Sequence, residues 1–153
     1  MKLIEFCDYD GIRPYIEKID MTGWSAARLL ANYLRTRTLE SYLLEGWRIF
    51  MLVDEEKDGR IVSFVTYSRR DCVIDDALFP WIGFVFTAPE YRGNRYAGRL
   101  IEHCCDIAQS EGMKDVYIGT PHTGLYEKYG FEYLFDRTEQ DGNKCRVYHK
   151  NIY

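Results

Sequence analysis

The order of predicted elements indicates an α/β protein in which helices flank a mixed sheet. Three observations carry this prediction. Residues 48–53 are almost all apolar, as in a strand covered on both faces, and Asp58-Gly59 is typical of a hairpin turn into a strand over 60–67. Residues 81–101 form an apolar strand, a glycine-containing loop and the start of an amphipathic helix. A strand over 116–119 follows that helix, so the two strands should be parallel neighbours in a βαβ unit.

The first part of the chain predicts one strand and helices. Residues 2–7 are a short apolar segment, which we expect at a sheet edge, and residues 11–19 predict a helix with Pro14 in its first turn. Residues 26–34 place apolar side chains on one helical face. Thr38 is predicted to cap a second helix, which Gly46 ends.

The last part predicts a short helix and a hairpin. After a loop over 69–79 and the βαβ unit, residues 125–129 should form a short helix that Gly130 ends. Residues 131–135 and 145–149 then pair around Asp141-Gly142. The sequence contains no repeat, linker or low-complexity segment, and we expect residues 1–153 to form a single domain.

Composition limits the function. With 20 basic and 24 acidic side chains the formal charge is −4, which argues against nucleic acid as a partner. No apolar run approaches the ~20 residues that span a bilayer, and no signal peptide is evident. We therefore expect a cytoplasmic protein with no membrane partner. The five cysteines lack the spacing of a disulfide framework or a zinc site, so we expect no metal.

The segment 81–101 predicts an anion site. Pro89 ends the strand because it cannot donate to a sheet. The first N–H groups of the following helix lack intrahelical partners, and the helix dipole favours negative charge there. Small residues let a phosphate approach the main chain, and cations lie beside them. The small residues are Gly93, Ala97 and Gly98, and the cations are Arg92, Arg95 and Arg99. An ordinary strand–loop–helix connection with solvated arginines is the alternative.

Two blocks resemble a known family. Residues 89–97, Pro-Glu-Tyr-Arg-Gly-Asn-Arg-Tyr-Ala, resemble the acetyl-CoA loop of the GNAT N-acetyltransferases, Arg/Gln-x-x-Gly-x-Gly/Ala. Arg92 and Ala97 match, whereas Arg95 replaces the middle glycine. Residues 124–131, Gly-Leu-Tyr-Glu-Lys-Tyr-Gly-Phe, resemble the family's Leu-Tyr-Glu-Lys-x-Gly-Phe segment. The resemblance implies a mostly antiparallel central sheet with a splayed parallel strand pair.

The resemblance also implies a reaction, the transfer of an acetyl group from the cosubstrate acetyl-CoA to a primary amine of a small molecule or a protein. The attack would be direct, in a ternary complex. Backbone groups of the central strand would polarise the thioester, and the loop would hold the diphosphate. These cofactor-binding residues are Val85, Phe86, Thr87, Arg92, Gly93, Asn94, Arg95, Tyr96, Ala97 and Gly98.

Tyr126 is the candidate that protonates the departing thiolate, because it occupies the position of the family's tyrosine. A phenol with a pKa of ~10 is protonated at neutral pH and can supply a proton. The alternative is a packing tyrosine, since the chain has thirteen.

The general base is not evident. The family often uses a carboxylate on the central strand, but residues 81–87 contain none. His122 could titrate near neutral pH, although a lone histidine in a turn is more often structural. Asp75 and Asp76 could attract a cationic amine, and a water chain is a further alternative.

The acceptor is expected at the first helices and the 69–79 loop, where Trp24, Tyr33, Tyr42 and Trp47 could face an ammonium group or fill the core. A homodimer is left open. The alternative function is a catalytically weak acyl-CoA-binding sensor. A nucleotide-binding domain is disfavoured because the loop lacks a P-loop pattern.

Overall fold

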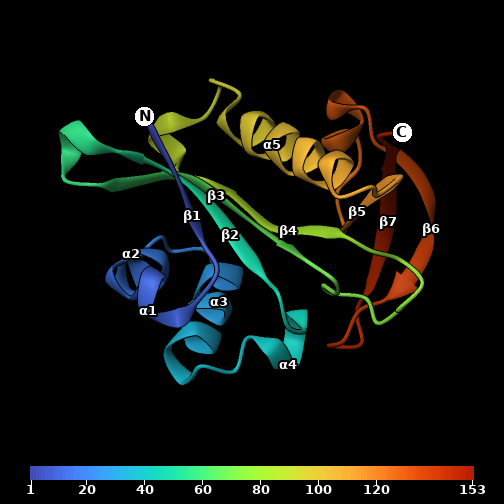
Figure 1. Cartoon of the computed structure of the whole chain (residues 1–153), viewed down its shortest axis with the longest axis horizontal. Coiled ribbons are helices and arrows are strands. Elements are labelled where there is room, and N and C mark those ends of the chain that lie inside the picture. Colours follow the sequence, from blue (N-terminus) through green and yellow to red (C-terminus); the bar gives the residue numbers. More distant parts are fainter.

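The computed structural model describes residues 1–153 and contains one seven-stranded sheet in the order β1-β2-β3-β4-β5-β7-β6 (Figure 1). Every neighbouring pair is antiparallel except β4 and β5, which are parallel as the βαβ unit predicted. The strands are β1 (Lys2–Phe6), β2 (Arg48–Asp54), β3 (Arg60–Ser68), β4 (Trp81–Thr87), β5 (Asp115–Thr120), β6 (Glu132–Thr138) and β7 (Lys144–Asn151).

Helices cover the two faces of the sheet (Figure 1). On one face lie α1 (Tyr9–Ile12), α2 (Ile16–Asp20), α3 (Ser25–Thr36) and α4 (Glu40–Leu43), and on the other lies α5 (Tyr96–Ser110). Alternate residues of the central strands point to opposite faces, so Met51 packs on the α3 side and Phe50 on the α5 side. The nearly continuous apolar sequence of β2 follows from this double coverage.

The parallel pair β4–β5 is splayed, as the family resemblance implied. The two strands pair only at Trp81 and Tyr117, near the start of β4. Beyond that point β4 contains a bulge, where Phe84 and Val85 together face Val65 of β3. Phe84 takes a left-handed backbone conformation with φ 46°. A bulge bends its strand, and here β4 leaves β5 before either strand ends.

Local details of the first helices differ from the prediction. The expected helix over 11–19 is α1, a short 3-10 turn η1 (Arg13–Tyr15) and α2, because Asp8 caps the chain earlier through the N–H of Gly11. The predicted cap by Thr38 is wrong, since α4 begins after Leu39 without a side-chain cap. The Thr38 hydroxyl instead lies 2.7 Å from that of Thr36.

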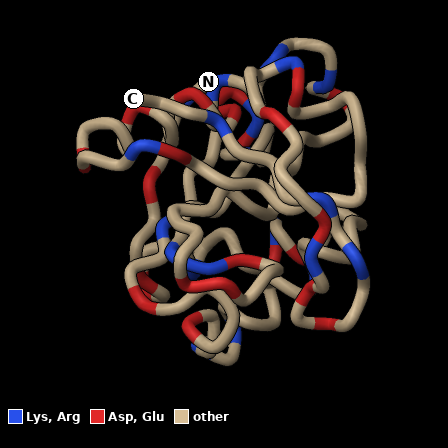
Figure 2. The backbone as a smooth tube through the Cα atoms, turned by 90° about the vertical axis from the view of Figure 1, so that its right-hand side faces the viewer, with Lys and Arg blue, Asp and Glu red and all other residues tan.

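Basic and acidic residues are interspersed along the chain (Figure 2). None of the helices has the length and apolar composition that crossing a membrane requires.

Candidate active site

A cleft of about 760 Å³ opens where β4 and β5 diverge. One wall is the β4 segment from Gly83 to Thr87, and the other is the end of β5 from Ile118 to Thr120. Each strand directs every second backbone N–H and C=O group sideways, and these groups have no strand partner across the gap. The cleft is therefore edged by free main-chain polar groups, which suits an extended ligand containing amides.

The N-terminus of α5 forms one end of the cleft. The first bond of this helix runs from the Arg99 N–H to the Arg95 carbonyl, so the N–H groups of Tyr96, Ala97 and Gly98 have no partner within the helix. No acidic side chain lies in its first turn and none caps it. The helix end thus combines free donors with the positive end of the helix dipole, as an anion site requires.

Arg95 takes the conformation that the family's glycine would supply. Its φ is 59°, in the left-handed region that costs a non-glycine residue roughly 1 kcal/mol. The main chain therefore turns into α5 despite the missing glycine, with the arginine side chain exposed at the cleft. Arginine in place of the family's glycine at position 95 therefore does not change the backbone conformation at the start of α5.

The other predicted loop residues divide into two groups. Arg92, Gly93, Tyr96 and Ala97 line the cleft, and the Arg92 guanidinium donates to the Thr87 carbonyl at 3.2 Å. Two residues lie outside the lining. The side chain of Asn94 donates to the Tyr91 carbonyl at 3.0 Å, and Gly98 is buried against the ring of Tyr129. A contribution of these two residues through their backbone N–H groups stays a prediction.

The three strand residues predicted to polarise the thioester, Val85, Phe86 and Thr87, all line the cleft. Their wall is fixed from behind by Ser63 of β3, whose hydroxyl donates to the Phe86 carbonyl at 2.6 Å. This contact holds β4 in place after the bulge.

Tyr126 reaches the cleft from η4 (Tyr126–Tyr129), the short helix predicted in the second family block. Its ring is buried at 7% exposure and lies edge-to-face with Phe131. Burial raises the pKa of the phenol, and the nearby Asp71 carboxylate and Tyr129 add to the rise. Tyr126 is therefore a neutral hydrogen-bond donor throughout the physiological range.

His122 also lines the cleft, at an exposed turn between β5 and η4. Its backbone N–H donates to the Thr120 hydroxyl and its carbonyl accepts from Tyr148, so the main chain is fixed while the ring is not. Asp75 and Asp76 lie outside the cleft lining. Asp76 pairs with Arg70 at 2.8 Å, and Asp75 accepts from the Ala77 N–H.

Asp71 is the titratable residue of the cleft that the sequence did not reveal. It lies in the loop between β3 and β4, is 5% exposed and lines the cleft beside Gly83. Its Oδ1 atom is buried without a hydrogen-bond partner. Burial raises the pKa of this carboxyl to about 6, partly offset by the adjacent Cys72 backbone N–H and thiol. The sequence signal that could have located this contact is the pair of glycines inside predicted strands, at 83 and 119. A glycine within a strand often marks a place where another part of the molecule approaches the backbone closely.

The aromatic rim of the cleft comes from the first helices. Trp24 and Tyr42 line it, together with Thr22, Gly23 and Ala26. Trp24 stacks on Phe86 with ring centroids 5.7 Å apart, and Tyr42 meets Phe84 edge-on at 5.9 Å. The other two aromatic candidates lie behind the rim: Tyr33 packs on Tyr42, and Trp47 is buried and donates to Glu40.

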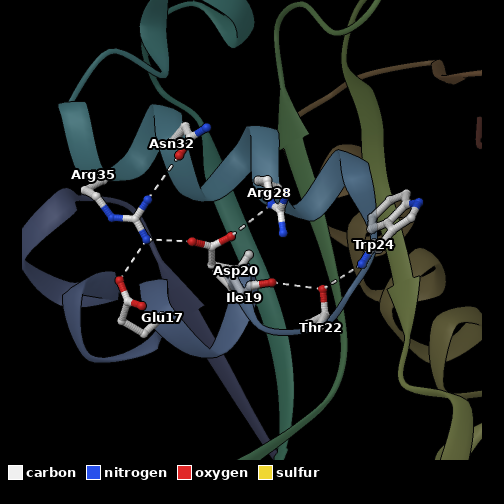
Figure 3. Close-up of polar contacts among 8 residues, drawn as sticks. All are labelled: Glu17, Ile19, Asp20, Thr22, Trp24, Arg28, Asn32 and Arg35. Carbon is white, nitrogen blue, oxygen red and sulfur yellow. Dashed lines mark hydrogen bonds and ion pairs between the residues drawn. The ribbon is translucent and has the colours of Figure 1, made fainter.

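Polar contacts fix the turn that carries Trp24 (Figure 3). The Arg35 guanidinium on α3 binds both Glu17 and Asp20 of α2, at 2.8 and 2.9 Å, which joins the two helices. At the end of α2 the Thr22 hydroxyl donates to the Ile19 carbonyl and accepts from the Trp24 N–H. The rim is thus anchored to the helical layer.

Cys72, Glu139 and Cys145 form a cluster beside Asp71. The two sulfur atoms and a carboxylate oxygen of Glu139 lie within 4.8 Å of one another, a grouping that the sequence spacing did not indicate. A hydrogen bond with Cys145, together with burial, strongly raises the pKa of the Cys72 thiol, so the thiol is protonated.

Comparison with known proteins connects this geometry to an enzyme class. The sequence matches the model of the acetyltransferase (GNAT) family over residues 15–131. Among solved structures, an aminoglycoside 6'-acetyltransferase type Ii superposes with a TM-score of 0.72 at 16% identity, covering 100% of this chain and 98% of that one. No curated protein matches the chain.

Two further structures share the fold. An aminoglycoside 6'-N-acetyltransferase complexed with coenzyme A has a TM-score of 0.67 at 14% identity, over 100% of this chain and 98% of the other. An acetyltransferase of the GNAT family from Staphylococcus aureus Mu50 has a TM-score of 0.65 at 15% identity, over 99% of both chains.

The split sheet and the family match together define an acyltransferase. The matched segment spans most of the 153 residues, and the chain belongs to the GNAT acetyltransferase family.

Proposed function

We propose that the protein transfers an acetyl group from acetyl-CoA to a primary amine of a small molecule, by direct attack in a ternary complex. The observation that carries the proposal is the continuity of the cleft. The free N–H groups of α5 and the rim of Trp24 and Tyr42 lie on opposite faces of the sheet, and both line the cleft together with the edge of β4. Donor and acceptor can therefore meet at β4 without a covalent enzyme intermediate.

The donor would lie with its diphosphate at the N-terminus of α5 and its pantetheine arm along β4. The exposed Arg92 and Arg95 add positive charge at the diphosphate end. Amides of the arm could pair with backbone groups of Val85 and with the N–H of Thr87, whose carbonyl already accepts from Arg92. A backbone N–H near Phe86 would then polarise the thioester carbonyl, and one such donor contributes on the order of 3 kcal/mol to lowering a barrier.

Tyr126 would donate to the thioester sulfur. It lines the same cleft as β4, and no hydrogen bond contributes to the environment of its hydroxyl. Because burial keeps the phenol protonated, its proton is available as negative charge develops on the sulfur.

The part of the cleft proposed to bind the acceptor favours a small-molecule amine over a protein amine. Aromatic faces of Trp24 and Tyr42 suit an ammonium group, and Asp71 is the acidic residue in the lining. The solved structures with this fold include aminoglycoside 6'-acetyltransferases, which supports a polyamine-like acceptor. We expect no metal requirement, and acetyl-CoA is the cosubstrate.

The test measures release of free CoA from acetyl-CoA across a panel containing kanamycin, spermidine, single amino acids and a lysine-containing peptide. We expect release above the no-amine blank with at least one small amine, and mass spectrometry should show that amine heavier by one acetyl group. CoA release with the peptide alone would show that the acceptor is a protein amine and not a small molecule. Acetyl-CoA binding by calorimetry without release for any amine would favour the acyl-CoA sensor.

A further inference from the structure

We propose that Asp71 is the catalytic base of this enzyme: its carboxylate takes the proton from the acceptor amine. The proposal rests on the acetyltransferase function proposed above. It assigns the base to the loop between β3 and β4, because β4 itself carries no carboxylate between Trp81 and Thr87.

The carboxylate occupies space left open by a glycine. A Cβ atom added to Gly83 would lie 2.6 Å from Cγ of Asp71, so any other residue at 83 would displace this side chain. Gly83 is on β4, one residue before the bulge, at the point where β4 leaves β5. The Asp71 side chain therefore reaches into the opening between the strands.

Cys72, the next residue of the loop, packs against β5 in the same way. A Cβ atom on Gly119 of β5 would lie 2.5 Å from Sγ of Cys72. Two consecutive loop residues thus fill two glycine positions on the two diverging strands, and together they close the narrow end of the opening. Asp71 therefore lines the cleft against Gly83 of β4, and it lies close enough to Tyr126 for its charge to raise the pKa of that phenol.

Hydrogen bonds hold the loop in that position. The Gln140 side chain donates to the Asp71 carbonyl at 2.6 Å, and the Gln140 backbone N–H donates to the Cys72 carbonyl at 2.7 Å. Val73 forms an isolated bridge with Glu139. The backbone on both sides of the carboxylate is therefore paired, whereas Oδ1 itself has no partner.

The groups around Asp71 supply no positive charge. Tyr42 on α4, Tyr126 on η4 and Glu139 after β6 are close enough for the Asp71 charge to raise the pKa of each, and Cys72 adjoins it. Arg70, the nearest cation in sequence, pairs with Asp76 instead. A buried carboxylate without a cation is costly to keep for packing alone, but it suits an incoming ammonium group. Burial raises the Asp71 pKa to about 6, which leaves the carboxylate largely ionised and basic at neutral pH.

The reaction balances with these two residues. The acceptor enters as an ammonium ion, and Asp71 takes one proton to give the neutral amine. The nitrogen lone pair forms the N–C bond, and the C–S bond breaks as Tyr126 gives its proton to the sulfur. The second proton leaving nitrogen restores Tyr126, and Asp71 releases the first to water. The products are the acetamide, CoA as the thiol and one proton.

The test compares Asp71→Asn with the wild type on the panel amine that gives the highest kcat/KM. At pH 7 we expect kcat to fall by about 100-fold or more, within the range for loss of a general base. The wild-type kcat/KM should decline below about pH 6 as Asp71 becomes protonated, and the variant should lack that decline. The variant should recover at high pH, where the amine loses its proton to solvent.

The matched control is Asp106→Asn, which changes an exposed aspartate on α5 outside the cleft and should leave kinetics unchanged. Acetyl-CoA affinity of Asp71→Asn by calorimetry should equal that of the wild type. Transfer by Asp71→Asn within threefold of the wild type with the same pH profile would overturn the assignment and leave the proposed function standing. Loss of acetyl-CoA binding would also overturn it, because Asp71 would then support the donor site. Failure of the wild type to acetylate any amine would instead reject the proposed function.

Discussion

The proposed donor end of the cleft is made by one continuous segment, residues 85–97, whereas the proposed acceptor end combines residues from distant parts of the chain. The donor end presents backbone N–H groups and two arginines. The acceptor end presents aromatic rings and a buried carboxylate, which Gln140 holds from the far hairpin. The donor end thus depends on main-chain conformation, and the acceptor end depends on side chains meeting across the fold. Substitutions should therefore affect the two ends in different kinetic constants.

The largest effect is expected for Gly83→Ala. The added methyl group would displace the Asp71 carboxylate, and we expect kcat to fall by roughly 100-fold or more while acetyl-CoA affinity is retained. Steady-state kinetics and calorimetry would measure the two quantities. Gly11→Ala is the control, since it also places a methyl group against an aspartate, 2.9 Å from Oδ1 of Asp8, in a milder contact outside the cleft lining. A larger loss of donor affinity than of kcat would contradict the separation of the two ends.

Asp71→Asn should change stability in a pH-dependent way. Burial raises the Asp71 pKa from 3.8 to about 6, so the folded state disfavours the charged form. The free energy of unfolding of the wild type is therefore highest with respect to this group below about pH 4, and it decreases as the pH rises through 6. Asparagine carries no charge at either pH, so the variant avoids that decrease. Above pH 7 the variant should be more stable by on the order of 3 kcal/mol, and below pH 4 the two proteins should be alike. Urea unfolding at both pH values would measure this, and equal stability at pH 8 would contradict it.

Tyr126→Phe removes the proposed proton donor to sulfur but keeps the ring packing against Phe131. We expect kcat to fall by about 10- to 100-fold with acetyl-CoA affinity unchanged. Tyr117→Phe is the matched control, because Tyr117 is a half-buried tyrosine of β5 outside the cleft lining. Full activity of Tyr126→Phe would remove the acid role.

The smallest effect is expected for Arg92→Ala at the donor end. The KM for acetyl-CoA should rise by about 10-fold and the KM for the amine should change little, because the backbone N–H groups that face the diphosphate remain. Arg99→Ala is the control, since Arg99 is exposed on α5 outside the cleft. Equal changes in both KM values would place Arg92 outside the diphosphate site.

That most of the loop after β4 lines the cleft could be predicted from the sequence because the loop residues are contiguous. Proline, glycine and the helical periodicity after residue 96 determine the local backbone, and Tyr126 follows from a second continuous block. Asp71 could not be predicted from Arg70-Asp71-Cys72, which carries no local pattern. Its role depends on Gly83, Gly119 and Gln140, which are brought together only by the folded sheet. The Thr38 cap was wrong because the chain enters α4 without a side-chain cap, and Thr36 is the neighbour of that hydroxyl.

Gln140 has a consequence for how such an enzyme diversifies. Its amide also donates to the Tyr42 carbonyl at 3.3 Å, so one residue at a hairpin tip touches both the aromatic rim and the Asp71 backbone. Hairpin tips accept insertions and exchanges readily. Under the proposed function, variation at this single tip would shift which amines are accepted while the residues proposed to bind the thioester stay constant. Preference for the nucleophile could then evolve separately from use of the donor.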